Sequence, residues 1–478
     1  MAGDQVPRAA DEETPLLRDT TQDAKTPNVD SNKSVYDRFT KKQKNAIVAV
    51  IALGGLAPFL IAGSFIPSIP QIAEDLETTG EVVSFAVGLA VGTSSFGSLI
   101  LSSYSGYYGR RPITLVCFII QCLGSLGIAT AWNVTGLLSW RVVQAFGTSI
   151  GMSLGLAIIG DIYRVEERGA ASGIYVGSIL LGPVMAPVIG GTVAHYGSWR
   201  VMQFGLSVYS LICVIAVYFF LPETSQPGSR GIEKAREKGE NPRFVLLNPL
   251  RGLLLLKSPN ILFIALVCSF AVMADFTLIV PISFTVGKTF NITNEAVIGA
   301  MCIPIGIGNC LGAPISGMIS DRTVIRLREK RGGVYVPEDR LWAGLLGSGV
   351  FLPCALIGAA LVMHFVEGTL GLVLIGFCLL SAGLGVVFTM NPLTAYAVDI
   401  LHDRSAEVMG AMSSLRGLFL AGYVAVLLPS INKFGILPTY TTVAAVVWVG
   451  FGLLVTTIKF GDRMRRMVDL KFTTSGHD

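Results

Sequence analysis

Long apolar stretches separated by short polar segments make up most of the chain. Each stretch is close to the roughly 20 residues that an α-helix needs to cross a bilayer. The pattern predicts an all-α integral membrane protein with twelve transmembrane helices. We place them at 46–66, 82–103, 113–131, 137–160, 170–192, 201–221, 260–284, 296–319, 341–363, 369–390, 407–431 and 438–459.

A long hydrophilic segment, residues 222–259, interrupts this pattern after the sixth apolar stretch. It predicts an N-terminal six-helix half at 46–221, a cytoplasmic linker at 222–259 and a C-terminal six-helix half at 260–460. Residues 1–45 form a polar tail rich in Pro, Thr, Asp and Lys, a composition typical of disorder. Residues 461–478 form a second cytoplasmic tail.

Composition agrees with a multi-span membrane protein. Charged residues make up 14% of the 478 residues, against about 25% in soluble domains. The net charge of +4 is spread over the loops, which argues against a nucleic-acid partner. The eight cysteines all lie in apolar stretches without metal-ligand spacing, so neither a zinc site nor a disulfide framework is predicted. We expect no cofactor, and no phosphate-loop motif for ATP is present.

Basic residues predict the orientation in the membrane. They gather before the first span, after spans two and four, in the linker, between spans eight and nine, and in the C-terminal tail. The other side holds only Lys288 and Lys433, with Arg200 at the edge of span six. Because basic loops stay on the cytoplasmic side, we expect both termini there. Asn133 and Asn291 begin N-x-T sequons on the outer side and are candidate glycosylation sites.

The segment GIYVGSILLGPVMAPVIGG, residues 173–191, carries glycines and prolines inside an apolar stretch. These residues cost roughly 1 and 3 kcal/mol in an ordinary helix interior. A membrane helix tolerates them when neighbouring helices satisfy the freed backbone groups, and close helix approach results. We interpret the segment as a bent helix that packs tightly and moves; a kinked packing helix without a transport role is the alternative.

The spacing within this segment resembles the antiporter motif of the major facilitator superfamily. Its members here are Gly173, Gly182, Ala186, Pro187, Gly190 and Gly191, with Ala186 where the family has Gly. The resemblance implies the family's fold, in which two six-helix halves related as internal repeats surround a central site.

Other segments resemble landmarks of the same family, in the expected order. They are Gly109-Arg110-Arg111-Pro112, Gly317-x3-Asp321-Arg322, Trp140-Arg141-x2-Gln144, Asp161-x6-Arg168-Gly169, Trp199-Arg200 and Leu221-Pro222-Glu223-Thr224. Ser102, Gly106 and Tyr107 depart from the first loop signature. The ordered set resembles the twelve-span drug:proton antiporter branch, its fungal members especially.

The resemblance implies a cytoplasmic latch built from charged loop residues. Its candidates are Arg110, Arg111, Asp161, Arg168, Asp321, Arg322 and Asp399. Asp161 and Asp399 end spans four and ten at corresponding places, and each is followed by a basic residue, Arg164 or Arg404. We therefore expect ion pairs there. For Arg110 and Arg111, simple anchoring at the membrane surface is the alternative.

Three charged residues lie inside predicted spans, away from the first and last residues of the span, where they are expensive and indicate function. By resemblance, Arg141 is a proton-coupling residue; otherwise it snorkels to the interface. Asp275 suits proton uptake and release or a cationic substrate, unless it is a packing acid. Arg416 suits an anionic substrate or an ion pair with a carboxylate such as Asp275. The residues Phe65, Gln144, Asn391, Pro392, Tyr396 and Tyr423 are candidates for a mixed polar and aromatic pocket.

We therefore expect a monomeric secondary transporter that exchanges protons for a small organic molecule and exports it. An organic acid, a secondary metabolite or a drug-like compound is the expected cargo, and the excess of buried arginine favours an anion. A proton symporter and a non-transporting sensor remain alternatives; only four histidines and no nucleophile-base pair argue against an enzyme. We expect the plasma membrane, although Glu12-Glu13-Thr14-Pro15-Leu16-Leu17 resembles an acidic dileucine signal and leaves the vacuolar membrane open.

Overall fold

The computed structural model describes residues 38–149, 151–163, 165–226, 228, 230–237, 239, 249–332, 334, 336–400 and 405–472. Regular secondary structure within these ranges is entirely helical, without a strand. The predicted all-α membrane fold is confirmed. The dileucine segment and most of the N-terminal tail lie outside the described residues.

The helices of the first half follow the order of the predicted spans. They are α2 (Lys41–Phe65) with η1 (Ile66–Ser68) and α3 (Ile69–Asp75), α4 (Gly80–Tyr108), α5 (Arg110–Ala129), α6 (Val134–Thr148) with α7 (Gly151–Ile162), α8 (Val165–Leu180) with α9 (Gly182–Tyr196), and α10 (Trp199–Phe220). The linker contributes α11 (Gly231–Glu237) and η2 (Pro249–Lys257).

The second half repeats this arrangement with different breaks. Its helices are α12 (Pro259–Ile279) with α13 (Ile282–Thr289), α14 (Glu295–Met301) with α15 (Ile303–Lys330), η3 (Pro337–Ala343) with α16 (Gly344–Leu346), η4 (Gly347–Phe351) and α17 (Leu352–Phe365), α18 (Gly368–Ile400), α19 (Ser405–Phe434) and α20 (Ile436–Phe472).

Eleven helical stretches in the described ranges are long and apolar enough to cross a membrane. The remaining predicted span, 137–160, is divided between α6 and α7, each shorter than a span, on either side of residue 150. Several helices run past their apolar stretch: α20 continues through the charged residues Asp462, Arg463 and Arg465. Hydropathy therefore located the spans but not the helix ends.

Proline and its missing N–H account for most interruptions inside the spans. Pro183 stands just after the break between α8 and α9, Pro281 between α12 and α13, and Pro304 at the start of α15. The bend expected within residues 173–191 lies at Leu181, between α8 and α9.

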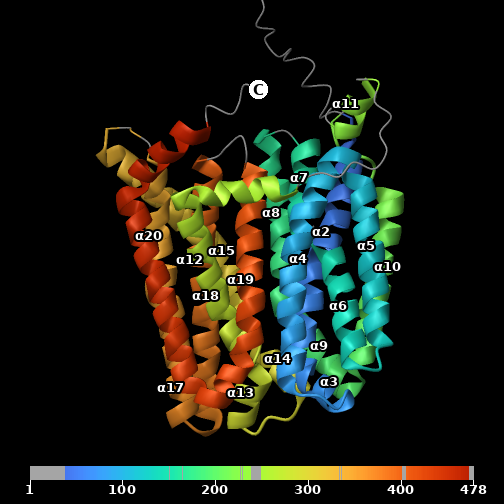
Figure 1. The fold of residues 1–478 in the computed structure, drawn as a ribbon, viewed down its shortest axis with the longest axis vertical. Helices are drawn as coiled ribbons and strands as arrows, with labels where there is room; N and C mark the ends of the chain where they lie inside the picture. The colour runs from blue at the N-terminus through green and yellow to red at the C-terminus, as the bar shows by residue number, and fades with distance from the viewer. Residues whose placement is uncertain are drawn as a thin grey trace, which may run out of the picture.

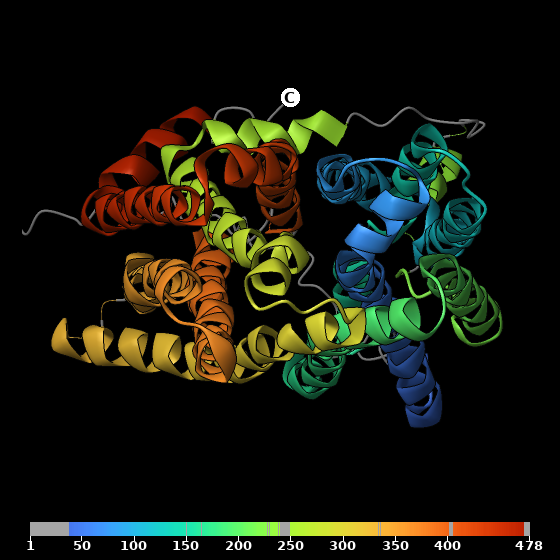
Figure 2. The ribbon, with the colours of Figure 1, turned by 90° about the horizontal axis from the view of Figure 1, so that it is seen from below.

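The two halves stand side by side (Figure 1), and the view from below separates them into two bundles (Figure 2). They meet along α4 with α19 and along α9 with α14. Small residues permit the approach: a Cβ built at Gly88 of α4 would lie 2.9 Å from the Ala421 carbonyl oxygen of α19. Close backbone contact of this kind is the usual means of helix association in membranes.

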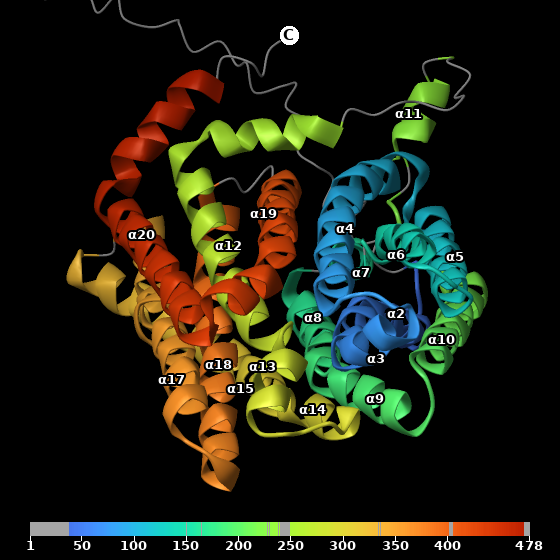
Figure 3. The ribbon, with the colours of Figure 1, turned by 60° about the horizontal axis from the view of Figure 1, so that its bottom comes forward.

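The two ends of the bundle differ in charge. We call the end that carries Arg110, Arg340 and Arg465 the basic end; it is at the top of Figure 1, near α11. The opposite end, where α3 meets α4 and α13 meets α14, is the far end (Figure 3). The linker helix η2 lies at the basic end and contacts α12, α19 and α4, so it touches both halves.

Candidate functional site

Arg141 is held inside the first half. Its side chain on α6 is 1% exposed, so it does not snorkel to an interface. One guanidinium nitrogen donates to Gln144 Oε1 at 2.6 Å, another donates to the Ile61 carbonyl oxygen at 3.5 Å, and the group lies 4.2 Å from the centre of the Phe65 ring. No carboxylate of the described residues lies within ion-pair distance of it.

The second half also holds an arginine inside the bundle, Arg416. It lies on α19, donates to Ser413 Oγ at 3.2 Å, and has the Cys268 thiol nearby. Among the residues that the structure describes, no acid forms an ion pair with Arg416, so the predicted alternative of a pair with Asp275 is not formed. Each half thus holds one guanidinium inside the bundle, buried for Arg141 and partly buried for Arg416, without a counter-ion from the described residues.

Asp275 lies on α12, four residues before the helix ends at Ile279, and so toward the far end. Its Oδ1 is buried and has no hydrogen-bond partner among the described residues. The Cys302 thiol at the end of α14 is near this carboxyl group. Two residues further along α12, Thr277 Oγ1 and Tyr423 Oη are 2.7 Å apart, which ties α12 to α19. An acid in this setting gains most from binding a proton or a cation.

The residues predicted to line one pocket lie in separate places. Phe65 and Gln144 surround Arg141, and Tyr423 lies beside α12. Tyr396 is fully buried and donates to Glu338 Oε1 at 3.1 Å, so it belongs to a charge cluster at the basic end. Asn391 donates to the Ala313 carbonyl oxygen at 3.3 Å and links α18 to α15, and Pro392 is buried within α18. Tyr396 therefore does not line a pocket with the others, because helix position alone does not give side-chain direction.

The antiporter-motif residues face two different partners. A Cβ at Gly182 or Gly190 would overlap Phe59 or the backbone of Ser64 on α2, within the same half. At Gly191 it would overlap the backbone of Glu295 on α14, in the other half. Ala186 and Pro187 are buried against α2 near Gly63, whereas Gly173 has open space. The motif therefore brings α9 close to α2 in its own half and to α14 in the other half.

Polar contacts join the two halves at the far end. His195 Nδ1 on α9 and Glu295 Oε2 on α14 are 3.0 Å apart. On the other side of the bundle, Asn432 of α19 donates to Glu81 Oε1 of α4 at 2.7 Å. Toward the basic end, a Cβ at Gly177 of α8 or Gly317 of α15 would meet nothing within 4 Å. The His195–Glu295 and Asn432–Glu81 contacts thus hold the two halves together at the far end.

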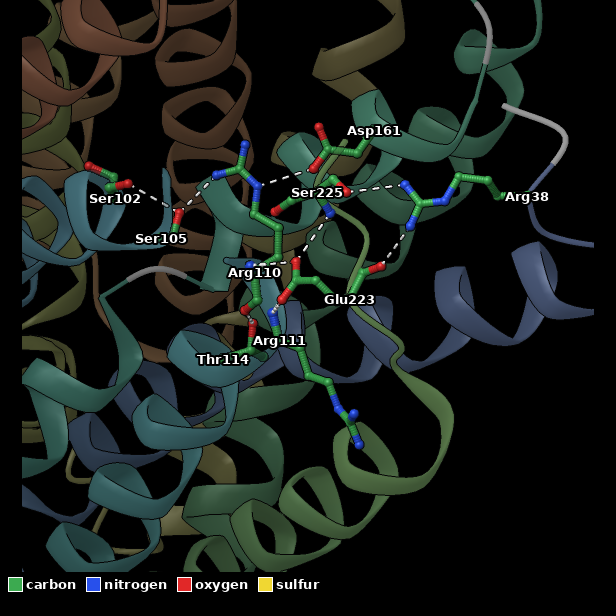
Figure 4. Close-up of polar contacts among 9 residues, drawn as sticks. All are labelled: Arg38, Ser102, Ser105, Arg110, Arg111, Thr114, Asp161, Glu223 and Ser225. Carbon is green, nitrogen blue, oxygen red and sulfur yellow. Dashed lines mark hydrogen bonds and ion pairs between the residues drawn. The ribbon is translucent and has the colours of Figure 1, made fainter. Parts of the chain in front are cut away.

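A charge cluster closes the basic end of the first half (Figure 4). The Glu223 carboxylate accepts from the backbone N–H groups of Arg110 at 2.9 Å and Arg111 at 3.3 Å, at the start of α5. The Arg110 side chain pairs with Asp161 at 3.1 Å. Gly109 has φ +113°, and a Cβ there would overlap the Glu223 carboxylate. Glycine is required here both for its conformation and for this approach.

The second half has a corresponding cluster. Arg340, at the start of span nine as Arg110 is at the start of span three, pairs with Asp399 at 2.9 Å and with Asp321 at 3.5 Å. Glu338, 4% exposed, pairs with Arg465 of α20 at 3.0 Å. In each half, these contacts thus join the start of the third span to the end of the fourth span. They also join it to the segment at the end of the sixth span.

Four of the predicted latch residues form ion pairs. Asp161 pairs with Arg110, and both Asp321 and Asp399 pair with Arg340. Arg111 donates to the Tyr218 carbonyl oxygen at 2.7 Å. Arg322 is exposed. Arg164 and Arg404 lie outside the described residues, as does the side chain of Arg168.

Sequence reasoning missed Glu223, Arg340, Glu338 and Arg465 as members of these clusters. Glu223 stood within a recognised landmark, and the equivalence of Arg340 to Arg110 could have been found by aligning the two halves. The candidate glycosylation residues differ in setting: Asn133 caps α6 by accepting from the Gly136 N–H at 2.7 Å. Asn291 is exposed in the loop between α13 and α14.

Comparison with known proteins identifies the family to which this chain belongs. Residues 51–422 match the model of the Major Facilitator Superfamily. The MFS-type transporter phiD from Fungal sp. is 25% identical over 503 residues, covering 96% of this chain and 75% of that protein. The efflux pump FUBT of Fusarium oxysporum is 26% identical over 405 residues, covering 80% and 66%. A partially occluded inward-open structure of the xylose transporter XylE from E. coli superposes with a TM-score of 0.63 at 14% identity, covering 88% of this chain and 98% of that one.

The contacts of α9 predict different consequences for neighbouring glycines. Gly190→Leu should destabilise the first half by about 1–3 kcal/mol through overpacking against α2. Gly191→Leu should instead push α14 away and open the far end. Thermal unfolding measures the first effect, and maleimide modification of the buried Cys302, quantified by mass spectrometry, measures the second.

Gly177→Leu is the matched control, because a side chain there enters open space. It should leave both the unfolding temperature and Cys302 modification near the wild-type values. Equal Cys302 modification in Gly191→Leu and Gly177→Leu would show that α9 and α14 do not close the far end.

Glu223→Ala should lower the stability of the solubilised protein by about 1 kcal/mol, because it removes the acceptor for two N–H groups at the start of α5. Glu237→Ala, which removes an exposed acid of α11, is the control. Thermal unfolding in detergent measures both, and an unfolding temperature as high in Glu223→Ala as in the control would contradict the capping role.

Proposed function

The chain belongs to the major facilitator superfamily, and from that premise we propose that it is a proton-coupled antiporter that exports a small organic anion, such as a carboxylate metabolite. The relatives of drug-efflux type support a transporter of this branch. The single observation that carries the anionic cargo is the pair of guanidinium groups inside the bundle, the buried Arg141 and the partly buried Arg416, without an acidic partner among the described residues.

A buried guanidinium without a counter-ion is unfavourable, since the interior replaces little of its lost hydration. An anionic cargo that reaches such a group supplies the missing charge. Arginine also offers a planar fork that can bind a carboxylate through two hydrogen bonds. These properties favour a carboxylate over a cation as the cargo of the central site.

Asp275 supplies the proton side of the exchange in this proposal. Its Oδ1 has no hydrogen-bond partner among the described residues, so protonation relieves a buried negative charge. Proton binding on one side of the membrane and release on the other then drive the cargo in the opposite direction. The proton is the coupling ion, and no cofactor is required.

We assign the basic end to the cytoplasm, because basic loops remain on that side. The arrangement with the far end closed is then inward-facing and receives cargo from the cytoplasm. The close contact of α9 with α14 must loosen when the far end opens. We assign the protein to the plasma membrane, where export leads out of the cell, and we expect it to act as a monomer.

Inside-out vesicles with an acidic lumen test the proposed exchange. Radiolabelled mono-, di- and tricarboxylates are the probes, and at least one should accumulate until a protonophore collapses the pH gradient. Accumulation that needs an acidic exterior instead would indicate a symporter. A complete lack of accumulation with every carboxylate, beside efflux of a neutral or cationic drug, would overturn the anionic cargo.

Arg416→Ala should lower carboxylate affinity at least about tenfold, the size expected when one hydrogen bond to a charged group is lost. Arg416→Lys should have a smaller but clear effect, because it keeps the charge without the planar fork. Arg326→Ala, at an exposed position on α15, is the control. Unchanged affinity together with a large fall in unfolding temperature would assign Arg416 a structural role.

Asp275→Asn should abolish the dependence of transport on the pH gradient, because an amide binds no proton in this range. Cargo-for-cargo exchange, which moves no net proton, should persist. Glu367→Gln, which changes an exposed acid, is the control. Full dependence on the pH gradient in Asp275→Asn would exclude this carboxyl group as the coupling site.

A further inference from the structure

A chain of buried amides connects α10 to Arg141. Gln144 Nε2 donates to Gln203 Oε1 at 3.0 Å and to Ser125 Oγ at 2.8 Å. Gln144 Oε1 accepts from Arg141 at 2.6 Å. These side chains come from α6, α5 and α10, and each is at most 1% exposed.

The direction of every bond in this chain follows from arginine. A guanidinium has only N–H donors, so Gln144 must turn its oxygen toward Arg141. Its two amide hydrogens then point away and need acceptors, which Gln203 and Ser125 supply. If Gln203 were apolar, one hydrogen of Gln144 would lose its acceptor, and the amide would lose one of the two contacts that fix its orientation.

Gln203 has a feature that packing does not explain. Its Nε2 is buried and has no hydrogen-bond partner among the described residues. A buried N–H without a partner destabilises a fold by about 1–3 kcal/mol relative to a satisfied one. An apolar residue of the same size would avoid this cost. The hydrogen bond that the Gln203 oxygen accepts from Gln144 therefore offsets the cost of the unpaired N–H.

A second buried glutamine shows what a purely structural link looks like. Gln121 of α5 donates to Ser210 Oγ of α10 at 2.8 Å and also leaves one amide atom without a partner. It joins α5 to α10, as the Gln203 chain does, but no described bond leads from it to Arg141. The two helices therefore keep a polar link when Gln203 is changed.

We propose that Gln203 is a positioning residue for transport: through Gln144 it holds the Arg141 guanidinium in place between α6, the Ile61 carbonyl oxygen of α2 and the Phe65 ring. This inference rests on the proposed function, in which the Arg141 guanidinium supplies positive charge for the anionic cargo of a proton-coupled exchange. Gln203 itself contacts neither the guanidinium nor the cargo. Loss of its oxygen leaves Arg141 charged but less ordered.

The test uses the full chain in inside-out vesicles, with the carboxylate that accumulates best as the probe. Gln203→Met keeps the size of the side chain and removes the acceptor; Gln203→Glu keeps an acceptor oxygen. Gln121→Met is the matched control. Initial rates are measured over a range of lumenal pH, with KM and maximal rate separated, and unfolding temperatures are measured for each variant.

Gln203→Met should lower the maximal rate about tenfold, the size of one hydrogen bond to a charged group, and should change the pH profile. Gln203→Glu should restore most of the rate. Gln121→Met should lower the unfolding temperature as much as Gln203→Met does while its rate and pH profile stay normal. In an Arg141→Lys background the effect of Gln203→Met should shrink, since interacting residues are not additive.

Two results would overturn the inference: equal rates in Gln203→Met and Gln121→Met, or full additivity of Gln203→Met with Arg141→Lys. Arg141→Ala separates this inference from its premise. A defective Arg141→Ala beside a normal Gln203→Met would overturn the positioning role alone. Normal proton-coupled transport by Arg141→Ala would instead overturn the role proposed for Arg141.

Discussion

The two halves are held together by close contact between helix backbones. Residues with little or no side chain make this contact possible. In a bilayer, apolar side chains gain little by leaving lipid for another helix, so association depends on packing and polar contacts. Gly191 against Glu295 and Gly88 against Ala421 supply the packing across the halves. His195 with Glu295 and Asn432 with Glu81 supply the polar contacts. An interface of this kind can part without exposing a large hydrophobic surface to water.

Strong ionic contacts are instead kept within each half. Arg110 with Asp161 joins helices of the first half, and Arg340 with Asp399 joins helices of the second. Each half is therefore stiffened internally by ion pairs between arginine and a carboxylate, while a histidine and an amide contact Glu295 and Glu81 between the halves. This division suits two bodies that rock against each other, since the ion pairs within each half need not break in each cycle. Arg141 and Arg416, one in each body, keep donors available because described acids do not neutralise them.

The sequence predicted the fold well, because twenty-residue apolar stretches leave a membrane chain few alternatives. It placed Arg141, Asp275 and Arg416 inside spans and recognised the glycines of α9. It did not give the ion pairs of Asp161 with Arg110 and of Asp399 with Arg340, because these pairs form between helices whose relative rotation no local pattern encodes. The pocket was misjudged for the same reason: Tyr396 turns toward Glu338, and Asn391 toward Ala313. The chain from Gln203 to Arg141 joins residues 62 positions apart and has no signature along the sequence.

The clusters at the basic end also constrain the order in which the protein can be completed during synthesis. The first turn of α5 receives its acceptor from Glu223, more than a hundred residues later in the chain. Glu338 is buried early in the second half, yet its ionic partner Arg465 lies near the C-terminal end of the chain. Each half therefore becomes electrostatically complete only after its sixth span has emerged from the ribosome. A chain cut short within α20 would carry a buried carboxylate without its cation, a defect that the quality control of the membrane can detect.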